Sequence, residues 1–404
     1  MKILHLNTVV NVKSTGKIVY LIHSKLIENN HESMICYGRW RAADSDKSLI
    51  KISSNLEFFI HALLARITGM QGVFSFFSTW KLKKTIKKFN PDIVHLYNLH
   101  GYYVNEFGLF RFLKANNIST VYSMLDEYPY MGKCTYSMNC DKFMKKCYNC
   151  PEVKEYPKSF FFDFSTKIFN LKQNAYKDFE KIIFTGPEWV KERASASMLL
   201  KNKNIELMDE PIDTNFFFYP RNTELLIKKI NIAKEKVVVL TVATYEIKRK
   251  GGDYFIEVAK QLENSNILFV FVGYNGDTKL LPANILPISY VKDQHELATY
   301  YSMADLFVCT SYADTMPNVC LEALACGTSI CGFNISGIPY TADAKTGFFV
   351  PFPNTKFLAE YISKTKKKTP EDILKCREYA VKRYSIDSVY IKLIDIYSNL
   401  LRRV

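Results

Sequence analysis

The sequence predicts an α/β protein with parallel sheets that is divided into two domains. Strand-like apolar runs alternate with helix-like segments from Lys2 onward, which is the pattern of parallel α/β folds. The chain has 404 residues, more than one hydrophobic core usually holds, so two domains are expected. Its 48% hydrophobic and 23% charged residues are typical of an ordinary folded chain rather than a disordered or fibrous one.

Composition and charge limit the classes of partner. No window approaches the ~18 uninterrupted apolar residues of a membrane span. The short apolar start, Met1–Asn7, predicts a buried first strand rather than a signal peptide, so we expect a cytoplasmic protein. The net charge of +14 requires an anionic partner, such as nucleotide phosphates, a membrane surface or nucleic acid. Because the sequence has no RNP-type motif and no regular basic and aromatic interleaving, we expect no nucleic acid.

The first half of the chain is expected to form one parallel sheet. We expect a helix near Lys17–Asn29 and strands at Lys2–Asn7, Ser33–Cys36, Asp92–Leu96, Ser119–Ser123 and Lys181–Thr185. A loop with Thr15 and Gly16 joins the first strand to this helix. Glycine there allows a close backbone approach to a ligand, although a lone glycine in a turn is commonly only a turn.

The segment Asn55–Lys88 is less regular and combines aromatic residues with a lysine cluster. Two interpretations stay open. One is an interfacial element that faces anionic lipid. The other is a helix packed in the core, with a solvated basic face.

Polar residues follow two strands of the expected sheet. Asn98, His100 and Tyr102 come after Asp92–Leu96, and Asp126 comes after Ser119–Ser123. Open α/β sheets bind ligands at the carboxyl ends of their strands, so these residues are candidates for polar contacts to a substrate. A histidine at a strand end is equally often a structural residue.

Four cysteines lie within a short stretch in the pattern C-x5-C-x6-C-x2-C: Cys134, Cys140, Cys147 and Cys150. Four thiolates suit a structural tetrahedral Zn²⁺ site, and the last pair has the usual spacing. A disulfide or free thiols are the alternatives. Four cysteine ligands leave no open coordination position, so we expect no catalytic metal here. The remaining cysteines are scattered and are expected to be buried thiols.

The second half begins another series of strands and helices. The expected elements are Val237–Val242, Tyr254–Leu262, Ile267–Gly273, His295–Ser302, Asp305–Cys309 and the last helix, Asp387–Leu401. Lys248, Arg249 and Lys250 stand with Gly251 between the first strand and the first helix of this series. Cations beside a glycine at a helix start suit a pyrophosphate, although such a run is commonly a solvated turn.

Two carboxylates flank the start of a helix in the stretch Ala313–Gly327. Asp314 is in the entering loop and Glu322 is on the expected helix, eight residues later. Pro317 is expected at the first helical position, which leaves the N–H groups near Asn318 and Val319 available to a phosphate. The alternative is an N-capping aspartate and a solvated glutamate.

This stretch resembles the E-x7-E signature of the family-four retaining glycosyltransferases, with Asp314 in place of the first glutamate. Further segments resemble the family in the same order: Lys13–Ile18, His95–Tyr103, the cysteine-rich insert, Met208–Thr214, Lys250-Gly251, Thr328–Phe333, Gly337–Pro339 and Gly347–Pro351. The histidine-containing segment and the insert are similar to those of an exopolysaccharide-type branch of the family.

The resemblance implies two facing Rossmann-like domains, the GT-B fold. Residues 1–214 would form an acceptor-side domain with the cysteine-rich insert at 134–150. Residues 215–386 would bind the nucleotide sugar, and the helix at 387–404 would return to the first domain. The implied activity is metal-independent, retaining transfer of a hexose from a nucleotide-diphosphate sugar to a glycan or lipid-linked acceptor in surface polysaccharide synthesis. The expected location is the cytoplasm, with peripheral association at the inner face of the cytoplasmic membrane.

The resemblance also implies a role for each candidate residue. Lys250 and Arg249 would stabilise the leaving diphosphate, Glu322 would bind the ribose, and Asp314 would bind the sugar hydroxyls. The implied donor-site residues are Thr15, Gly16, Gly251, Pro317, Asn318 and Val319. The implied acceptor-side residues are Asn98, His100, Tyr102 and Asp126.

Four residues depart from the family pattern. Leu125 stands where the family has a histidine against the transferred sugar, and leucine donates no hydrogen bond. Lys13 replaces a glycine, Asp314 is one methylene shorter than glutamate, and Pro211 lies in an altered hinge peptide. These departures keep alternatives open: a catalytically impaired nucleotide-sugar-binding protein, a sugar-nucleotide epimerase of the same fold, and a nucleic-acid binder with a cysteine knuckle.

Overall fold

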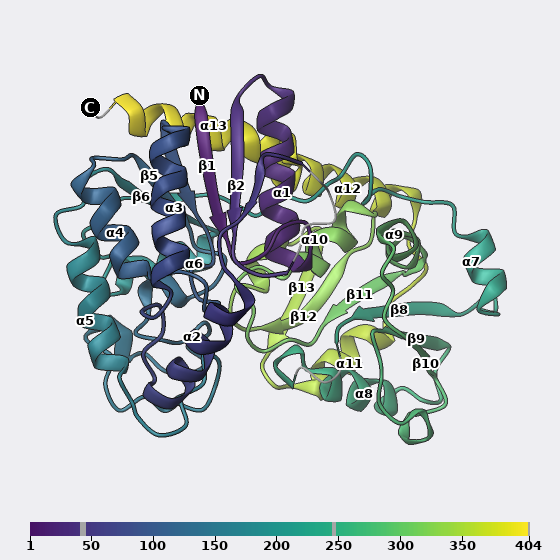
Figure 1. Ribbon diagram of the computed structural model, residues 1–404. Helices are drawn as coiled ribbons and strands as arrows, with labels where there is room; N and C mark the ends of the chain where they lie inside the picture. Colours follow the sequence, from purple (N-terminus) through teal and green to yellow (C-terminus); the bar gives the residue numbers. More distant parts are fainter. Residues whose placement is uncertain (41–45, 245–247, 403–404) are drawn as a thin grey trace. The chain divides into compact units, whose positions relative to one another are not determined.

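The computed structural model describes residues 1–40, 46–244 and 248–402 (Figure 1). The chain divides into two compact units. Unit 1 comprises Met1–Pro211 together with Val389–Val404, and unit 2 comprises Ile212–Ser388. The sequence-based boundaries fall a few residues away, after positions 214 and 386.

Unit 1 is built on a parallel sheet. In the described residues it has seven strands in the order β3-β2-β1-β4-β5-β6-β7. The strands are β1 (Lys2–Asn7), β2 (Glu32–Tyr37), β3 (Leu49–Lys51), β4 (Ile93–Leu96), β5 (Thr120–Ser123), β6 (Ile182–Gly186) and β7 (Ile205–Leu207). The helices of this unit are α1 (Lys13–Glu28), α2 (Asn55–Thr68), α3 (Phe76–Phe89), α4 (Glu106–Ala115), α5 (Ser165–Tyr176) and α6 (Glu188–Ala196), with short 3-10 turns η1 (Tyr128–Tyr130) and η2 (Lys142–Met144).

Unit 2 repeats the plan with six strands among its described residues, in the order β10-β9-β8-β11-β12-β13. The strands are β8 (Val237–Val242), β9 (Ile267–Val272), β10 (Ile285–Ile288), β11 (Leu306–Cys309), β12 (Ile330–Asn334) and β13 (Gly347–Pro351). The helices are α7 (Glu224–Lys229), α8 (Gly252–Gln261), α9 (Gln294–Met303), α10 (Asn318–Ala325), α11 (Thr355–Ser363) and α12 (Pro370–Tyr384), and the 3-10 turns are η3 (Lys248–Lys250), η4 (Thr278–Leu280) and η5 (Pro339–Thr341).

The apolar runs form strands in unit 2 because both faces of this sheet are buried. Along β9, Val270 and Val272 face one hydrophobic cluster, whereas Phe269 and Phe271 face another. A parallel strand covered on both faces requires a continuous apolar run rather than an alternating pattern. The predicted class, an α/β fold with two parallel-sheet, Rossmann-like domains, is therefore confirmed.

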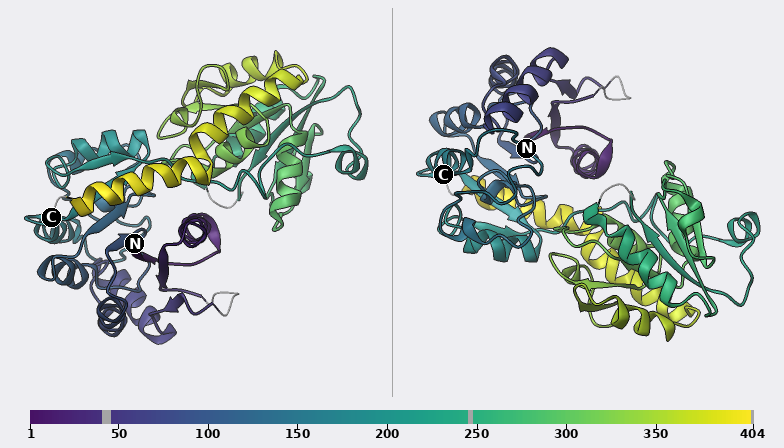
Figure 2. Two further views of the ribbon diagram at one scale, coloured as in Figure 1. Left: turned by 90° about the horizontal axis from the view of Figure 1, so that it is seen from above. Right: turned by 90° about the horizontal axis from the view of Figure 1, so that it is seen from below.

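The last helix, α13 (Ile386–Arg402), carries the chain back into unit 1 (Figure 2). Tyr397 lies 2.6 Å from His95 Nδ1 on β4, and Tyr390 lies 3.1 Å from His31 Nε2. These contacts fix the returning segment to the sheet of unit 1. Among the described helices, none is long and apolar enough to cross a bilayer.

The strand order determines where ligands are expected. In each sheet the connections leave in opposite directions from one central pair of strands, β1 and β4 in unit 1 and β8 and β11 in unit 2. A crevice forms at the carboxyl ends of such a pair, and open α/β proteins bind ligands there. The candidate residues Asn98, His100, Lys250 and Asp314 all follow one of these central strands.

Three local expectations were wrong. The segment Asn55–Lys88 is not irregular, because it forms the two regular helices α2 and α3. Thr15 and Gly16 are in the first turn of α1 rather than in a loop, since this helix begins at Lys13. Pro317 is the N-cap of α10 rather than its first residue, with ψ of 109°, and the helix begins at Asn318.

Candidate functional site

The first candidate site lies in unit 2, where a basic turn packs against the segment that follows β11. The turn η3 contains Arg249 and Lys250 and ends at Gly251, the N-cap of α8. Gly251 has φ of +68°, and a Cβ there would lie 1.9 Å from the carbonyl oxygen of Thr310. Only glycine permits this approach. The N–H of Tyr312 also donates to the carbonyl of Arg249 at 3.0 Å, so the two segments are fixed together.

Asp314 forms ion pairs with two of the three cations of this turn. Its Oδ1 lies 2.7 Å from Arg249 NH1 and 3.0 Å from Lys250 Nζ, and its Oδ2 lies 2.9 Å from Lys250 Nζ. The Asp314 side chain is 8% exposed, whereas those of Arg249 and Lys250 are 26% and 23% exposed. The carboxylate is therefore buried beneath two cations that still reach solvent. Lys248, in the same turn, is exposed.

Electrostatics keep this carboxylate ionised. Burial alone raises the pKa of Asp314, but the charges of Lys250 and Arg249 and their hydrogen bonds outweigh it and lower the pKa below its ordinary value. Gly337 also fixes the loop that carries Asp314. The N–H of Gly337 donates to the Asp314 carbonyl at 2.9 Å, and a Cβ on Gly337 would lie 1.7 Å from the carbonyl oxygen of Thr315.

The second carboxylate of the signature has a different partner. Glu322, within α10, accepts a hydrogen bond from the Tyr301 hydroxyl of α9 at 2.7 Å. Burial, together with Glu322 itself, raises the pKa of Tyr301 well above its usual value, so this hydroxyl stays a donor. The structure therefore joins Arg249, Lys250 and Asp314 directly and orients Glu322 through Tyr301. No sequence signal indicated Tyr301 as this partner, because it lies on another helix. Asn318 and Val319 form the first turn of α10.

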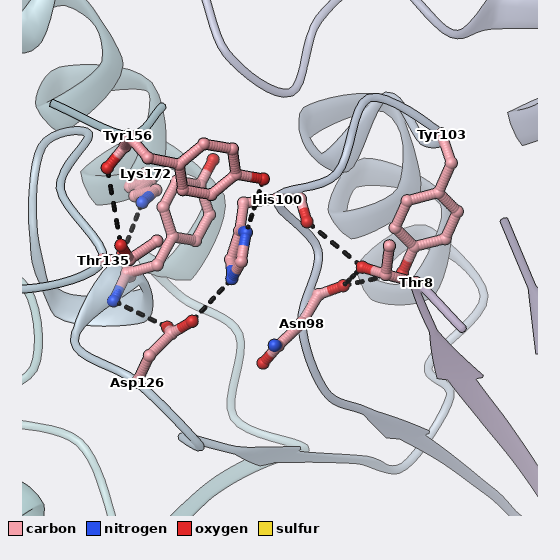
Figure 3. A network of polar contacts seen from close by, with 9 residues as sticks. Thr8, Asn98, His100, Tyr103, Asp126, Thr135, Tyr156 and Lys172 are labelled. Atoms are coloured by element: carbon pink, nitrogen blue, oxygen red, sulfur yellow. Dashed lines mark hydrogen bonds and ion pairs between the residues drawn. The ribbon is translucent and has the colours of Figure 1, made fainter. Parts of the chain in front are cut away.

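The second candidate site lies in unit 1, at the ends of β4 and β5 (Figure 3). His100 Nε2 lies 2.5 Å from Asp126 Oδ2, and His100 Nδ1 lies 3.2 Å from the Tyr156 hydroxyl. Asp126 Oδ1 accepts the N–H of Tyr128 at 3.0 Å. The structure thus brings His100 and Asp126 together. It adds Tyr156, which sequence analysis missed because this residue follows the cysteine-rich insert.

The other two acceptor-side candidates are held by different neighbours. The Asn98 carbonyl accepts the hydroxyls of Thr8 and Tyr103 at 2.9 and 3.0 Å, and Thr8 also donates to the His100 carbonyl at 3.1 Å. This backbone is therefore tied to the end of β1. Tyr102 is buried with φ of +62°, and its ring contacts Phe58, so its environment favours a packing role.

A buried polar network supports the turn after Asp126. Lys172 donates to the carbonyls of Tyr128 and Met131 at 2.6 and 3.1 Å, and its ammonium lies 3.3 Å from the centre of the Tyr128 ring. The Tyr128 hydroxyl donates to Glu106 at 2.9 Å. Burial lowers the pKa of Lys172 to about 8. These contacts fix the backbone that presents Asp126 to His100.

Thr15 and Gly16 lie in the same unit, after β1. Gly16 is buried, and a Cβ there would lie 3.0 Å from Val9 Cγ2 and 3.3 Å from the Asn11 nitrogen. Packing within unit 1 therefore explains this glycine, and its contact with a donor stays a prediction.

Leu125 lines a small pocket of unit 1. Its wall has apolar residues, among them Ile18 and Ile22, and polar ones, among them Asp209 and Glu210. The position that carries a histidine in the similar family thus holds a side chain that donates no hydrogen bond in this chain.

The four cysteines of the insert line one pocket as free thiols. Cys134 Sγ and Cys150 Sγ are 3.8 Å apart, and Cys147 Sγ accepts the N–H of Gly132 at 3.2 Å. Two sulfurs bound to one tetrahedral Zn²⁺ at ~2.3 Å are separated by about 3.8 Å. As arranged, however, no three His, Cys, Asp or Glu side chains in the described residues converge on a metal position. The zinc site stays a prediction, and the Cys134–Cys150 pair fits it.

We expect the purified protein to contain stoichiometric zinc, because four cysteines line this pocket and the sulfurs of Cys134 and Cys150 have the separation of two zinc ligands. Cys150→Ser is expected to lose the metal and to lower the melting temperature. The control Cys376→Ala, in unit 2, is expected to keep the metal. The check is elemental analysis, with thermal melts before and after chelation. A metal-free protein with an unchanged melt after chelator treatment would remove the zinc hypothesis.

Glu127 gives a pH-dependent prediction. Burial raises its pKa from 4.5 to about 7, although Ser137 and Arg193 oppose the shift. Between these pH values the folded chain holds a proton that the unfolded chain has released, so stability falls as pH rises from 4.5 to 7. We expect Glu127→Gln to stabilise the protein at pH 8, by on the order of 3 kcal/mol or less, and to change little near pH 5. Thermal melts at both pH values test this. If Glu127→Gln destabilises the protein equally at both pH values, the charged Glu127 carboxylate is favourable and the prediction is wrong.

Part of the chain is similar to known protein families and relatives. Residues 222–383 match the model of the family described as "Glycosyl transferases group 1". A Klebsiella pneumoniae protein described as an uncharacterized 41.2 kDa protein in the cps region is 27% identical over 181 residues, which are 43% of this chain and 50% of the relative. The putative colanic acid biosynthesis glycosyl transferase WcaC of Escherichia coli is 22% identical over 169 residues, 39% of this chain and 41% of the relative. The chain thus spans half or less of the length of these curated relatives.

Solved structures match over nearly the whole chain. WaaG, a glycosyltransferase involved in lipopolysaccharide biosynthesis, gives a TM-score of 0.65 at 16% identity and covers 98% of this chain and 99% of its own. Anabaena HepE in complex with UDP gives a TM-score of 0.65 at 13% identity. The match covers 99% of this chain and 100% of the HepE chain. Sucrose-phosphate synthase from Thermosynechococcus elongatus gives a TM-score of 0.68 at 13% identity, and the match covers 100% of both chains. Residues 222–383 thus match a group 1 glycosyl transferase domain, within a chain whose two-domain α/β fold is similar to that of GT-B glycosyltransferase structures.

Proposed function

We propose that this protein is a retaining glycosyltransferase that moves a sugar from a nucleotide-diphosphate donor to a glycan or lipid-linked acceptor in surface polysaccharide synthesis. The observation that carries the proposal is the cluster of Arg249, Lys250 and Asp314 at the carboxyl ends of β8 and β11. It lies within the group 1 glycosyl transferase domain. The similarity to WcaC, a putative colanic acid biosynthesis glycosyl transferase, supports the polysaccharide assignment.

The two cations would stabilise the leaving diphosphate. Negative charge develops on that group as the bond to the sugar breaks, and fixed cations stabilise it without reorganising water. Arg249 and Lys250 are partly exposed and have fixed positions, because both bind the buried carboxylate of Asp314. Asp314 would therefore position the cations as well as meet the sugar hydroxyls. Charge handled by arginine and lysine is the basis for proposing metal independence.

The backbone around the cluster would bind the rest of the donor. Gly251 lets the basic turn approach the strand end closely, and α10 begins at Asn318 after Pro317. The positive end of a helix dipole favours phosphate groups near such a helix start. Glu322, oriented by the Tyr301 hydroxyl, would accept hydrogen bonds from the ribose. HepE, which has a similar fold, was solved in complex with UDP, and this supports a nucleotide donor.

In unit 1, the acceptor would meet His100 and Asp126. The carboxylate orients the imidazole, and Tyr156 holds its other nitrogen. In the mechanism that the resemblance implies, the acceptor hydroxyl attacks from the face that the diphosphate leaves, and the leaving phosphate takes its proton. His100 would then position the hydroxyl rather than act as a nucleophile.

A second candidate function is that of a catalytically impaired nucleotide-sugar-binding protein. Leu125, which lines a pocket with Ile18 and Ile22, favours it, because a hydrogen-bond donor to the sugar is missing at that position. The two functions predict the same donor binding and differ in turnover.

We expect Lys250→Ala to reduce transfer or donor hydrolysis by about a hundredfold or more, the usual cost of removing one fixed group that stabilises the transition state. Lys248→Ala is the matched control, since Lys248 is exposed in the same turn. The assay follows release of the nucleoside diphosphate from UDP-, GDP- and ADP-sugars. Equal activity of the Lys250 and Lys248 variants would contradict the proposed role.

A thermal-shift screen of the same donors separates the two candidate functions. At a hundred times its dissociation constant, a donor should stabilise the protein by about 2.7 kcal/mol. Stabilisation with turnover supports the transferase, and stabilisation without turnover for any acceptor supports the binding protein. If no nucleotide sugar stabilises the chain, both assignments are wrong.

A further inference from the structure

An outward-facing apolar stripe runs along α2 in unit 1. Its exposed members are Leu56, Phe59, Ile60, Leu63 and Ile67, a helical spacing that places them on one side. Phe59 is 66% exposed and Leu56 is 71% exposed. The opposite side, with His61, Ala62 and Ala65, is the buried one. This helix therefore packs its small side chains inward and presents its large apolar side chains to the outside, the reverse of an ordinary surface helix.

The neighbouring helix α3 continues the exposed apolar surface. It begins with Phe76 and Phe77, and Trp80 follows one turn later; Phe77 is 80% exposed. The two helix starts are joined by Glu57, whose carboxylate accepts the N–H groups of Phe77 and Ser78 at 2.8 and 3.0 Å.

A third segment, the aromatic run Phe160–Phe162, lies at the end of α2. Its three side chains are exposed, and the N–H of Phe160 donates to the Arg66 carbonyl at 2.8 Å. We call the exposed apolar side chains of α2, of the α3 start and of Phe160–Phe162 the apolar patch. Single exposed apolar residues are common on proteins, but this many large ones on three segments in contact mark an interaction surface.

Cations follow the aromatic residues along the same side of α3. Lys81, Lys84 and Lys88 share the helical side of Phe77 and Trp80, and Lys84 Nζ lies 3.8 Å from the centre of the Trp80 ring. At 1.5 Å per residue, Lys84 and Lys88 lie about 10 and about 16 Å beyond Phe77 along the helix. The segment Asn55–Phe89 contains six lysine or arginine residues and one acidic residue, Glu57. Because Glu57 binds the start of α3, little negative charge opposes these cations.

We propose that the apolar patch docks on an anionic lipid bilayer. Aromatic and aliphatic side chains would enter the boundary between headgroups and acyl chains, and the lysines of α3 would bind lipid phosphates. The charge argues for this occupant, since an apolar protein partner would not require a row of lysines beside the patch. The inference extends the proposed function by putting the chain at the surface where a lipid-linked acceptor resides. Docking itself does not depend on transferase activity.

The test is co-sedimentation of the full chain, without donor or acceptor, with vesicles of equal parts phosphatidylcholine and phosphatidylglycerol, compared with phosphatidylcholine alone. We expect binding to the anionic vesicles. Lys84→Gln with Lys88→Gln should weaken it about 25-fold, since each lysine near an anionic surface contributes roughly fivefold. The matched control is Lys260→Gln with Lys356→Gln in unit 2, which should change little.

Phe59→Glu and Phe77→Glu test the apolar part, and each should reduce binding at least tenfold. Leu225→Glu is their control, because Leu225 is 83% exposed but lies on α7 of unit 2. Size-exclusion chromatography and thermal melts accompany every variant. Three results would overturn the proposal: no binding to either vesicle, equal binding to both, or a dimer that Phe59→Glu converts to a monomer. The last result would assign the patch to contacts between copies of this chain.

Discussion

The candidate donor site depends on one buried carboxylate. Asp314 would be costly to bury alone, because an ion loses several kcal/mol of hydration when it leaves water. Two ion pairs, with Arg249 and Lys250, offset that cost and require the turn after β8 and the loop after β11 to lie together. The glycines at 251 and 337 follow from the same requirement, since any side chain at either position would collide with a backbone carbonyl within 2 Å. One interaction therefore fixes the position of two cations, the approach of two loops and the entry to α10.

The same logic appears in unit 1 with different residues. His100 and Asp126 follow adjacent strands and contact each other. The ammonium of Lys172 contacts the carbonyl and the ring of Tyr128 and so fixes the turn after Asp126. In both units a charged or hydrogen-bonded pair joins the segments that leave neighbouring strands. A parallel sheet brings these segments to one edge, and the polar pairs then determine their local geometry. The chemistry of both candidate sites thus lies at the strand ends, while the buried apolar faces of the sheets provide the rigid support.

Sequence analysis predicted the α/β class and the bounds of β1 and β8, because continuous apolar runs are a strong local signal. It also singled out Asp314, Arg249, Lys250, His100 and Asp126, which the structure brings together within their units. It failed where the partner is distant in the chain. Nothing near Glu322 indicates Tyr301, and nothing near His100 indicates Tyr156. It described Asn55–Lys88 only as less regular and left a helix with a solvated basic face as one alternative, because the exposed apolar stripe of α2 hides the usual pattern of an apolar inner and a polar outer side. Thr15 and Gly16 were expected in a loop, since the start of α1 lacks a capping residue.

The central claim is that Asp314 acts by holding Lys250 in place for a diphosphate. A double-mutant cycle tests it most directly, with inorganic pyrophosphate as the probe and calorimetry as the measurement for the wild type, Asp314→Asn, Lys250→Ala and the double variant. If Asp314 works through Lys250, the double variant should bind pyrophosphate no more weakly than Lys250→Ala alone, and the coupling should exceed about 1 kcal/mol. Additive losses, or pyrophosphate binding that none of these substitutions changes, would contradict the account.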